Sequence, residues 1–78
     1  MTPLEISEYK KRWYKTSSYY VITDELFEYE AKRWCRTNLD PHKWYFIKYT
    51  DCYEDTFLFE DEADKNKFVE QFLATKVK

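Results

Sequence analysis

Two runs of alternating large side chains, separated by a short polar break, restrict the fold of this chain more than any other feature. They form the stretch HKWYFIKYTDCYEDTFLFED, residues 42–61, in which bulky apolar side chains also stand at several positions between the alternating ones. Successive side chains of a strand point to opposite faces of a sheet. The stretch therefore predicts a β-hairpin with apolar side chains on both faces. A strand that is half buried needs only one such face, so the second face requires a cover or a use.

The register of this hairpin follows from its turn. Strands over residues 43–50 and 54–60 leave an even-numbered turn centred on Asp51 and Cys52. Such a turn places Phe46 opposite Phe57, Trp44 opposite Phe59, and Lys48 opposite Asp55. Aromatic pairs and a pair of opposite charges are favourable across two strands. We therefore assign this face to the core, under the helices.

The flanking segments supply helices and one more strand. Residues 18–23, SYYVIT, are typical of a strand, and Asp24 is a capping residue for a helix over residues 25–38. Asp61 with Asp64 indicates the start of a last helix, and Thr2, Pro3 and Glu5 indicate a short helix at the N-terminus. The predicted core collects the large rings of the covered face and of the helical stripes: Phe27, Trp34, Phe46, Phe57, Phe59, Phe68 and Phe72.

The order of these elements predicts the fold class. The chain of 78 residues reads as a single small α+β domain over 1–78, with 1–15 as an N-terminal helix or arm. The order resembles a ferredoxin-like βαββαβ unit that lacks its last strand. A right-handed crossover places the third strand between the first two, giving an antiparallel sheet of order 1-3-2 with two helices on one face.

The uncovered face of this sheet is the candidate interaction surface. The hairpin contributes Tyr45, Ile47, Tyr49 and Leu58. The first strand adds either Tyr19 and Val21, which we take into the candidate surface, or Tyr20 and Ile22. So much apolar area on one face is at the upper limit of what a monomer exposes.

Three covers are open for this face. The N-terminal helix can fold back and place Ile6, Tyr9 and Trp13 on the sheet, since an amphipathic helix needs a surface. A partner protein or a second copy of the chain can bind there. A single strand of nucleic acid is the third alternative, and it is disfavoured because Glu54 and Glu60 lie close by and repel phosphates.

A basic segment near the N-terminus carries the nucleic-acid alternative. It interleaves cations with rings, and its candidate binding residues are Lys10, Lys11, Arg12, Trp13, Tyr14 and Lys15. Rings that stack on bases and cations that neutralise phosphates are what single-stranded nucleic acid requires. The net charge of −2 opposes this function and favours an exposed helix face.

Residues for catalysis or metal binding are sparse. The sequence has no glycine, which excludes the glycine-rich phosphate loops and the GxSxG elbow. Its two cysteines, Cys35 and Cys52, and its single histidine, His42, match no zinc pattern and are more typical of free thiols and a solvated ring. We therefore expect no catalytic residue, no metal, no cofactor and no enzymatic activity.

The stretch YTDCYEDTFLFEDEADKNKFVEQF, residues 49–72, resembles small uncharacterised proteins of tailed bacteriophages, notably those that infect marine cyanobacteria. The resemblance lies in Asp51, the run Tyr53–Phe57, Phe59, and the closing Phe68 and Phe72. It implies a non-enzymatic accessory or regulatory protein in the cytoplasm of an infected bacterium, and a host protein as the partner. With no apolar run long enough for a membrane span, we expect a cytoplasmic protein that binds another protein or itself.

Overall fold

The computed structural model describes residues 1–49 and 53–76. It is an α+β fold, as the sequence predicts. In chain order its elements are α1 (Pro3–Lys11), β1 (Tyr19–Asp24), the 3₁₀ turn η1 (Glu25–Phe27), α2 (Glu28–Asn38), β2 (Trp44–Lys48), β3 (Glu54–Phe59), α3 (Glu62–Phe68), the π-helical turn η2 (Val69–Leu73) and α4 (Ala74–Lys76). The predicted turn residues Asp51 and Cys52 lie outside the described part of the chain.

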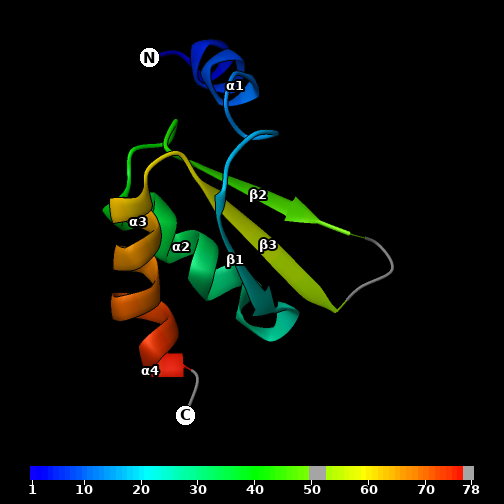
Figure 1. The fold of residues 1–78 in the computed structure, drawn as a ribbon, viewed down its shortest axis with the longest axis vertical. Coiled ribbons are helices and arrows are strands. Elements are labelled where there is room, and N and C mark those ends of the chain that lie inside the picture. Colours follow the sequence, from blue (N-terminus) through cyan, green and yellow to red (C-terminus); the bar gives the residue numbers. More distant parts are fainter. Residues whose placement is uncertain (50–52, 77–78) are drawn as a thin grey trace.

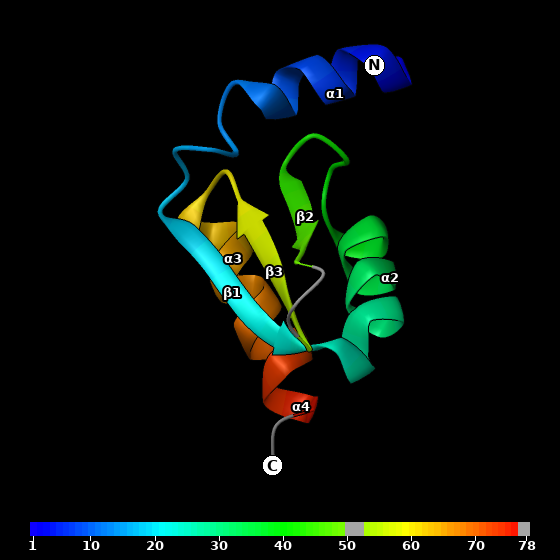
Figure 2. The same ribbon diagram turned by 90° about the vertical axis from the view of Figure 1, so that its right-hand side faces the viewer.

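The three strands form one antiparallel sheet in the order β1-β3-β2, as predicted. The continuous helical segment α3–η2–α4 and helix α2 both lie on one side of it (Figures 1 and 2). Figure 2 shows the sheet in front, with α3 behind β1 and β3. Neither view shows a helix of residues 1–49 and 53–76 on the other side of the sheet.

The predicted register of the hairpin is confirmed. Strands β2 and β3 pair Trp44 with Phe59, Phe46 with Phe57, and Lys48 with Asp55. Strand β1 adds a third column on this covered face, because Tyr19 lies opposite Phe59, Val21 opposite Phe57 and Thr23 opposite Asp55.

The core forms between this covered face and the helices. Phe57, Phe59 and Phe68 are fully buried, and Phe68 stacks on Phe72 of the next turn with 5.2 Å between ring centroids. Helix α2 contributes two small side chains to this core, Ala31 and Cys35, both fully buried. Of the predicted core residues, Phe27, Trp34 and Phe46 are only partly buried and pack around this centre.

The helix starts follow the predicted caps only in part. Thr2 and Glu5 form the complete capping box of α1. Asp24 caps η1 rather than α2, its carboxylate accepting the N–H of Leu26 at 2.9 Å. Asp61 precedes α3 but makes no side-chain capping bond; its carboxylate accepts a hydrogen bond from Lys43 Nζ at 3.0 Å instead. Asp61 is therefore the N-cap residue of α3, as predicted, but its carboxylate binds a lysine of the neighbouring chain segment and not the first turn of the helix.

Helix α1 lies beyond the ends of the strands and does not cover the front of the sheet (Figures 1 and 2). None of its residues is buried. One of its contacts is with the segment that joins α2 to β2: the ring of Tyr9 meets the ring of His42 edge-on, with 4.8 Å between centroids. The N-terminal helix is therefore not the lid that one of the three alternatives supposed.

Candidate interaction surface

The strand register defines the side of the sheet that faces away from the helices, called the open face from here on. Its residues are the alternate set of each strand, namely Tyr20 and Ile22 of β1, Leu58 and Thr56 of β3, and Tyr45 and Ile47 of β2. They form two rows across the sheet, Tyr20–Leu58–Tyr45 and Ile22–Thr56–Ile47. Five of these six side chains are large and apolar or aromatic.

Exposure across the open face is highest at β1. Tyr20 is 54% exposed and Ile22 is 52% exposed, whereas Leu58 in the middle strand is 8% exposed. Tyr49, immediately after β2, is 56% exposed. Large side chains such as isoleucine and tyrosine are usually mostly buried in folded proteins, whereas Tyr20, Ile22 and Tyr49 keep about half of their surface accessible. The open face is thus a partly wet apolar surface that runs across all three strands.

One corner of the open face is covered by the chain itself. Tyr14, in the turn after α1, stacks on Tyr45 with 4.3 Å between ring centroids and an interplanar angle of 25°. This contact explains why Tyr45 is half-buried although no helix lies over it. The cover does not extend to Tyr20 or Ile22.

Two residues of the predicted surface lie on the opposite side. Val21 is buried in the core and Tyr19 packs against it. The first strand therefore contributes Tyr20 and Ile22 to the open face, and the choice of Tyr19 and Val21 was wrong. The sequence YYVIT has a large side chain at each of its first four positions, so alternation alone does not decide which set faces the helices. Of the other predicted residues, Tyr45, Ile47 and Leu58 lie on the open face as expected, whereas Tyr49 follows the end of β2 and is exposed outside the paired register.

The basic segment is largely used within the molecule. Trp13 is 9% exposed, and its indole N–H donates to the carbonyl oxygen of His42 at 3.1 Å. Lys10 lies with its Nζ 5.0 Å from the ring centroid of Trp44, and desolvation lowers the pKa of its ammonium group. With Tyr14 stacked on Tyr45, only Lys11, Arg12 and Lys15 of the six candidate residues remain exposed.

A second set of polar contacts fastens α1 to the end of the sheet. The hydroxyl group of Tyr9 donates to both carboxylate oxygens of Glu60, at 2.9 and 2.7 Å, and this bond raises the pKa of Tyr9. Lys43 Nζ lies 3.0 Å from the carboxylates of both Glu60 and Asp61. These two carboxylates, Glu60 first, raise the pKa of Lys43. Glu60 is therefore engaged by two groups on the side of the molecule where α1 sits.

The other end of the sheet holds a lysine among three carboxylates. Lys48 Nζ lies 2.6 Å from Glu28, 3.6 Å from Glu25 and 3.8 Å from Asp55. Asp55 is fully buried, and neither of its carboxylate oxygens has a hydrogen-bond partner. Burial, followed by the negative charge of Glu28, raises the pKa of Asp55. The sequence predicts the pairing of Lys48 with Asp55 but not the burial of the carboxylate.

The remaining candidate chemical groups are buried or scattered. Cys35 is a free thiol in the core, and burial raises its pKa to about 12, which keeps it protonated and unreactive at neutral pH. Cys52 lies outside the described residues. Within residues 1–49 and 53–76, no three histidine, cysteine, aspartate or glutamate side chains are grouped so that they could hold a metal ion.

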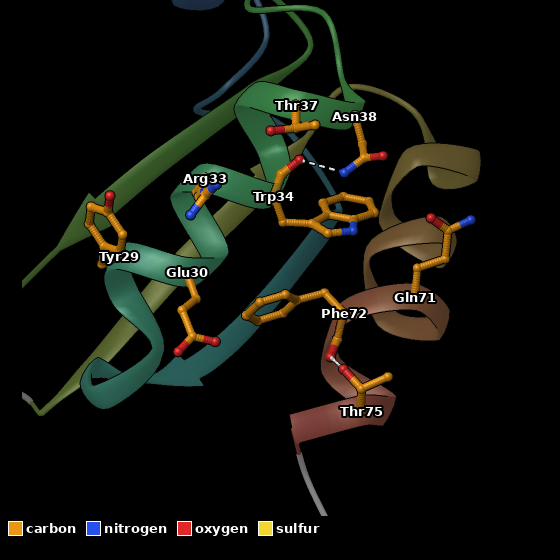
Figure 3. A pocket seen from close by; sticks show the side chains of 9 residues that line it. All are labelled: Tyr29, Glu30, Arg33, Trp34, Thr37, Asn38, Gln71, Phe72 and Thr75. Carbon is orange, nitrogen blue, oxygen red and sulfur yellow. Dashed lines mark hydrogen bonds between the residues drawn. The ribbon is translucent and has the colours of Figure 1, made fainter.

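The helical side of the molecule carries a groove of about 640 Å³ that sequence analysis did not anticipate. It lies between α2 and the last helical segment, with Trp34 and Phe72 pointing toward each other across it (Figure 3). Two of its polar side chains bind backbone carbonyls: Asn38 Nδ2 donates to Trp34 O at 2.9 Å, and Thr75 Oγ1 donates to Phe72 O at 2.7 Å. The other polar lining residues include Glu30, Arg33 and Gln71, so the groove has a mixed polar and apolar surface.

Comparison of the chain with protein-family models, with curated proteins and with solved structures found no match. No helix in the described part of the chain is long and apolar enough to cross a membrane.

Proposed function

We propose that this protein is a small non-enzymatic accessory or regulatory protein that binds another protein through its open face. The observation that carries the proposal is the exposure of Tyr20 and Ile22, each more than half accessible, beside Tyr45, Ile47 and Leu58. Tyrosine and large aliphatic side chains are typical of the centre of protein interfaces, because they bury much area with little loss of conformational freedom.

The charge around the open face favours a protein over a nucleic acid. Asp24 and Glu54 lie opposite each other at one end of β1 and β3, and both are exposed. Phosphates would be repelled there, whereas a partner protein can present lysine or arginine side chains to this rim. The polar rim and the apolar centre together resemble the layout of an ordinary protein interface.

The resemblance to small bacteriophage proteins supplies a setting for this proposal. It supports a role in the cytoplasm of an infected bacterium, with a host protein as the partner. Small phage proteins often act by binding host proteins, so the resemblance and the exposed face support the same mode of action.

Binding of single-stranded nucleic acid is the alternative function. It needs rings whose faces are free to stack on bases, yet the ring of Tyr14 is stacked on Tyr45 and Trp13 is buried. We expect an affinity for oligonucleotides weaker than about 100 µM at low salt, the weak end of non-specific binding. Micromolar binding that falls steeply with salt, and that disappears when Lys11, Arg12 and Lys15 are changed to alanine, would favour the alternative instead.

The proposal is tested by capturing partners on purified protein and identifying them by mass spectrometry. The extract comes from the cells in which the chain is naturally made, and three baits are compared: the wild type, Ile47→Glu and Tyr29→Glu. Ile47 lies on the open face, whereas Tyr29 is 71% exposed on the helical side. A protein retained by the wild type and by Tyr29→Glu, but lost with folded Ile47→Glu, supports the proposal. Equal capture by all three baits contradicts it.

A further inference from the structure

The two edges of the sheet are not equivalent, and the difference begins with the backbone hydrogen bonds. The N–H of Glu25 donates to the carbonyl of Tyr53 at 2.9 Å, one residue beyond the pair Asp24–Glu54. In an antiparallel ladder, hydrogen-bonded pairs recur at every second residue. Val21 and Thr23 therefore bond to β3, while Tyr20 and Ile22 turn their N–H and C=O groups to the outer edge of β1.

The same reasoning identifies the outward groups of β2. The N–H of Glu60 donates to the carbonyl of Lys43 at 3.1 Å, so the groups of Trp44, Phe46 and Lys48 point outward. At each of these three positions, either the residue itself is a lysine or a lysine side chain lies over its ring. Lys10 lies over the ring of Trp44, Lys32 Nζ lies 4.0 Å from the ring centroid of Phe46, and Lys48 is itself charged. Lysine at an edge is a common protection against pairing with another chain.

The edge of β1 lacks this protection. It contains no lysine and no proline, its one charge is Asp24 at the last position of the strand, and the register with β3 is continuous, without a bulge. Strand β1 forms one side of the sheet in Figure 2, and the residues that point their backbone groups outward are the half-exposed Tyr20 and Ile22. Unpaired backbone groups beside β-prone side chains form a template for another strand.

We propose that β1 pairs with β1 of a second copy of this chain, antiparallel and related by a two-fold axis at Val21. Tyr20 of one copy then lies opposite Ile22 of the other, with both residues of each pair exchanging N–H and C=O bonds. An aromatic side chain opposite a β-branched one is a favourable cross-strand pair. The two sheets join into a continuous sheet of six strands, and their open faces become one surface.

Charge supports a second copy as the occupant. The start of β1 follows the exposed cations Arg12 and Lys15, and its last residue is the exposed Asp24. Antiparallel pairing brings the basic start of each strand toward the acidic end of the other, whereas parallel pairing would place like charges together. The proposal does not depend on the proposed function, since it uses the backbone of one edge rather than a partner on the open face.

The first test needs no substitution. Sedimentation equilibrium of the full chain over a concentration series is expected to show a rise from the 9.8 kDa of one chain toward twice that mass. Amide hydrogen exchange under the same conditions is expected to protect Tyr20 and Ile22 only at concentrations that give the dimer, while Val21 and Thr23 are protected throughout. A monomer at every concentration up to about 1 mM, the weakest affinity in the ordinary range, overturns the proposal.

Two variants separate edge pairing from stacking of the open faces. Ile22→Pro removes an N–H that does not bond to β3, so the domain keeps its ladder while dimerisation weakens at least about tenfold. Ile47→Glu changes the open face far from this edge and is expected to leave the dimer intact. A dimer that survives Ile22→Pro, or one that Ile47→Glu dissociates, overturns edge pairing. If Ile22→Pro does not fold, Tyr20→Lys replaces it and is read by the same two outcomes.

Discussion

Asp55 is the residue whose position is hardest to reconcile with simple burial rules. Its carboxylate is inaccessible and lacks hydrogen bonds, and the hydroxyl group of Thr23 opposite it is also buried without a partner. Lys48 is 3.8 Å away but is drawn closer to Glu28, at 2.6 Å. A buried charge that is poorly paired costs stability, and this cost appears as a raised pKa.

We predict that Asp55→Asn stabilises the protein at neutral pH. Because the pKa of Asp55 is raised in the folded state, the folded chain holds the proton more tightly than the unfolded chain. The carboxylate therefore costs no stability below its ordinary pKa of 3.8, and the cost grows as pH rises through the folded-state pKa. Urea unfolding should show a gain for the variant at pH 7 that vanishes near pH 3.8.

The control for this prediction is Glu54→Gln, which removes an exposed carboxylate from the same strand. It is expected to leave the free energy of unfolding nearly unchanged at both pH values. A loss of stability in Asp55→Asn at neutral pH would instead show that attraction to Lys48 outweighs the burial of the charge.

Phe57 is the residue on which the core depends most. It is fully buried, and its ring lies 5.2 Å from that of Phe46 and 5.4 Å from that of Phe68, measured between centroids. Phe57→Ala is expected to lower the free energy of unfolding by about 3–5 kcal/mol, since it removes a large side chain and leaves a cavity. That is comparable with the whole stability of many small domains. Circular dichroism during urea unfolding measures it, with Thr56→Ala as the control on the open face; near-wild-type stability would contradict this assignment of the core.

At the scale of helices and strands, the sequence predicts those features that depend on the spacing of apolar residues and on the length of the hairpin turn. The register of β2 and β3 came from an even-numbered turn, and the strand order came from the order of the elements along the chain. The sequence does not predict which face of β1 is buried or where α1 packs. Both sides of YYVIT are large and apolar, and α1 has too few apolar residues to specify a site on the sheet. Tertiary contacts of Trp13 and Tyr9 position this helix instead.

Helix α1 itself should contribute little to stability compared with the residue that follows it. Deletion of residues 1–8 removes exposed helix and leaves Tyr9 and Trp13, so we expect a loss of about 1 kcal/mol or less. Trp13→Ala removes a buried ring and the hydrogen bond to His42, and is expected to cost about 3 kcal/mol. Thermal and urea unfolding compare the two. Equal losses would show that the helix, and not its attachment, holds this end of the molecule.

The molecule as a whole divides its apolar side chains between two sides of one thin sheet. The covered side has the buried rings of Phe57, Phe59 and Phe68, which give the fold its core. The open face keeps half-exposed side chains that add little to the core. Burying them in an interface contributes about 25 cal/mol for each Å² of apolar surface. Association therefore gains hydrophobic free energy that folding of the single chain does not provide. Folding and binding therefore draw largely on different residues, although Leu58 of the open face is itself buried, with 8% of its surface exposed.

This separation makes a prediction for the whole molecule. Replacing Tyr20, Ile22 and Tyr49 together by threonine removes apolar area from side chains that are 54%, 52% and 56% exposed. Threonine keeps a high preference for strands, so we expect the free energy of unfolding to fall by no more than about 1–2 kcal/mol. Association with other chains should fall much more, because the surface that favours it is gone. Urea unfolding and light scattering over a concentration series measure the two effects on one sample. The matched control is Val69→Thr, a single change in η2 on the helical side, which should lower stability by a similar amount while leaving association unchanged. A triple variant that fails to fold would show that the open face is part of the core, and neither the proposed binding of a partner nor a separate role for this surface would then stand.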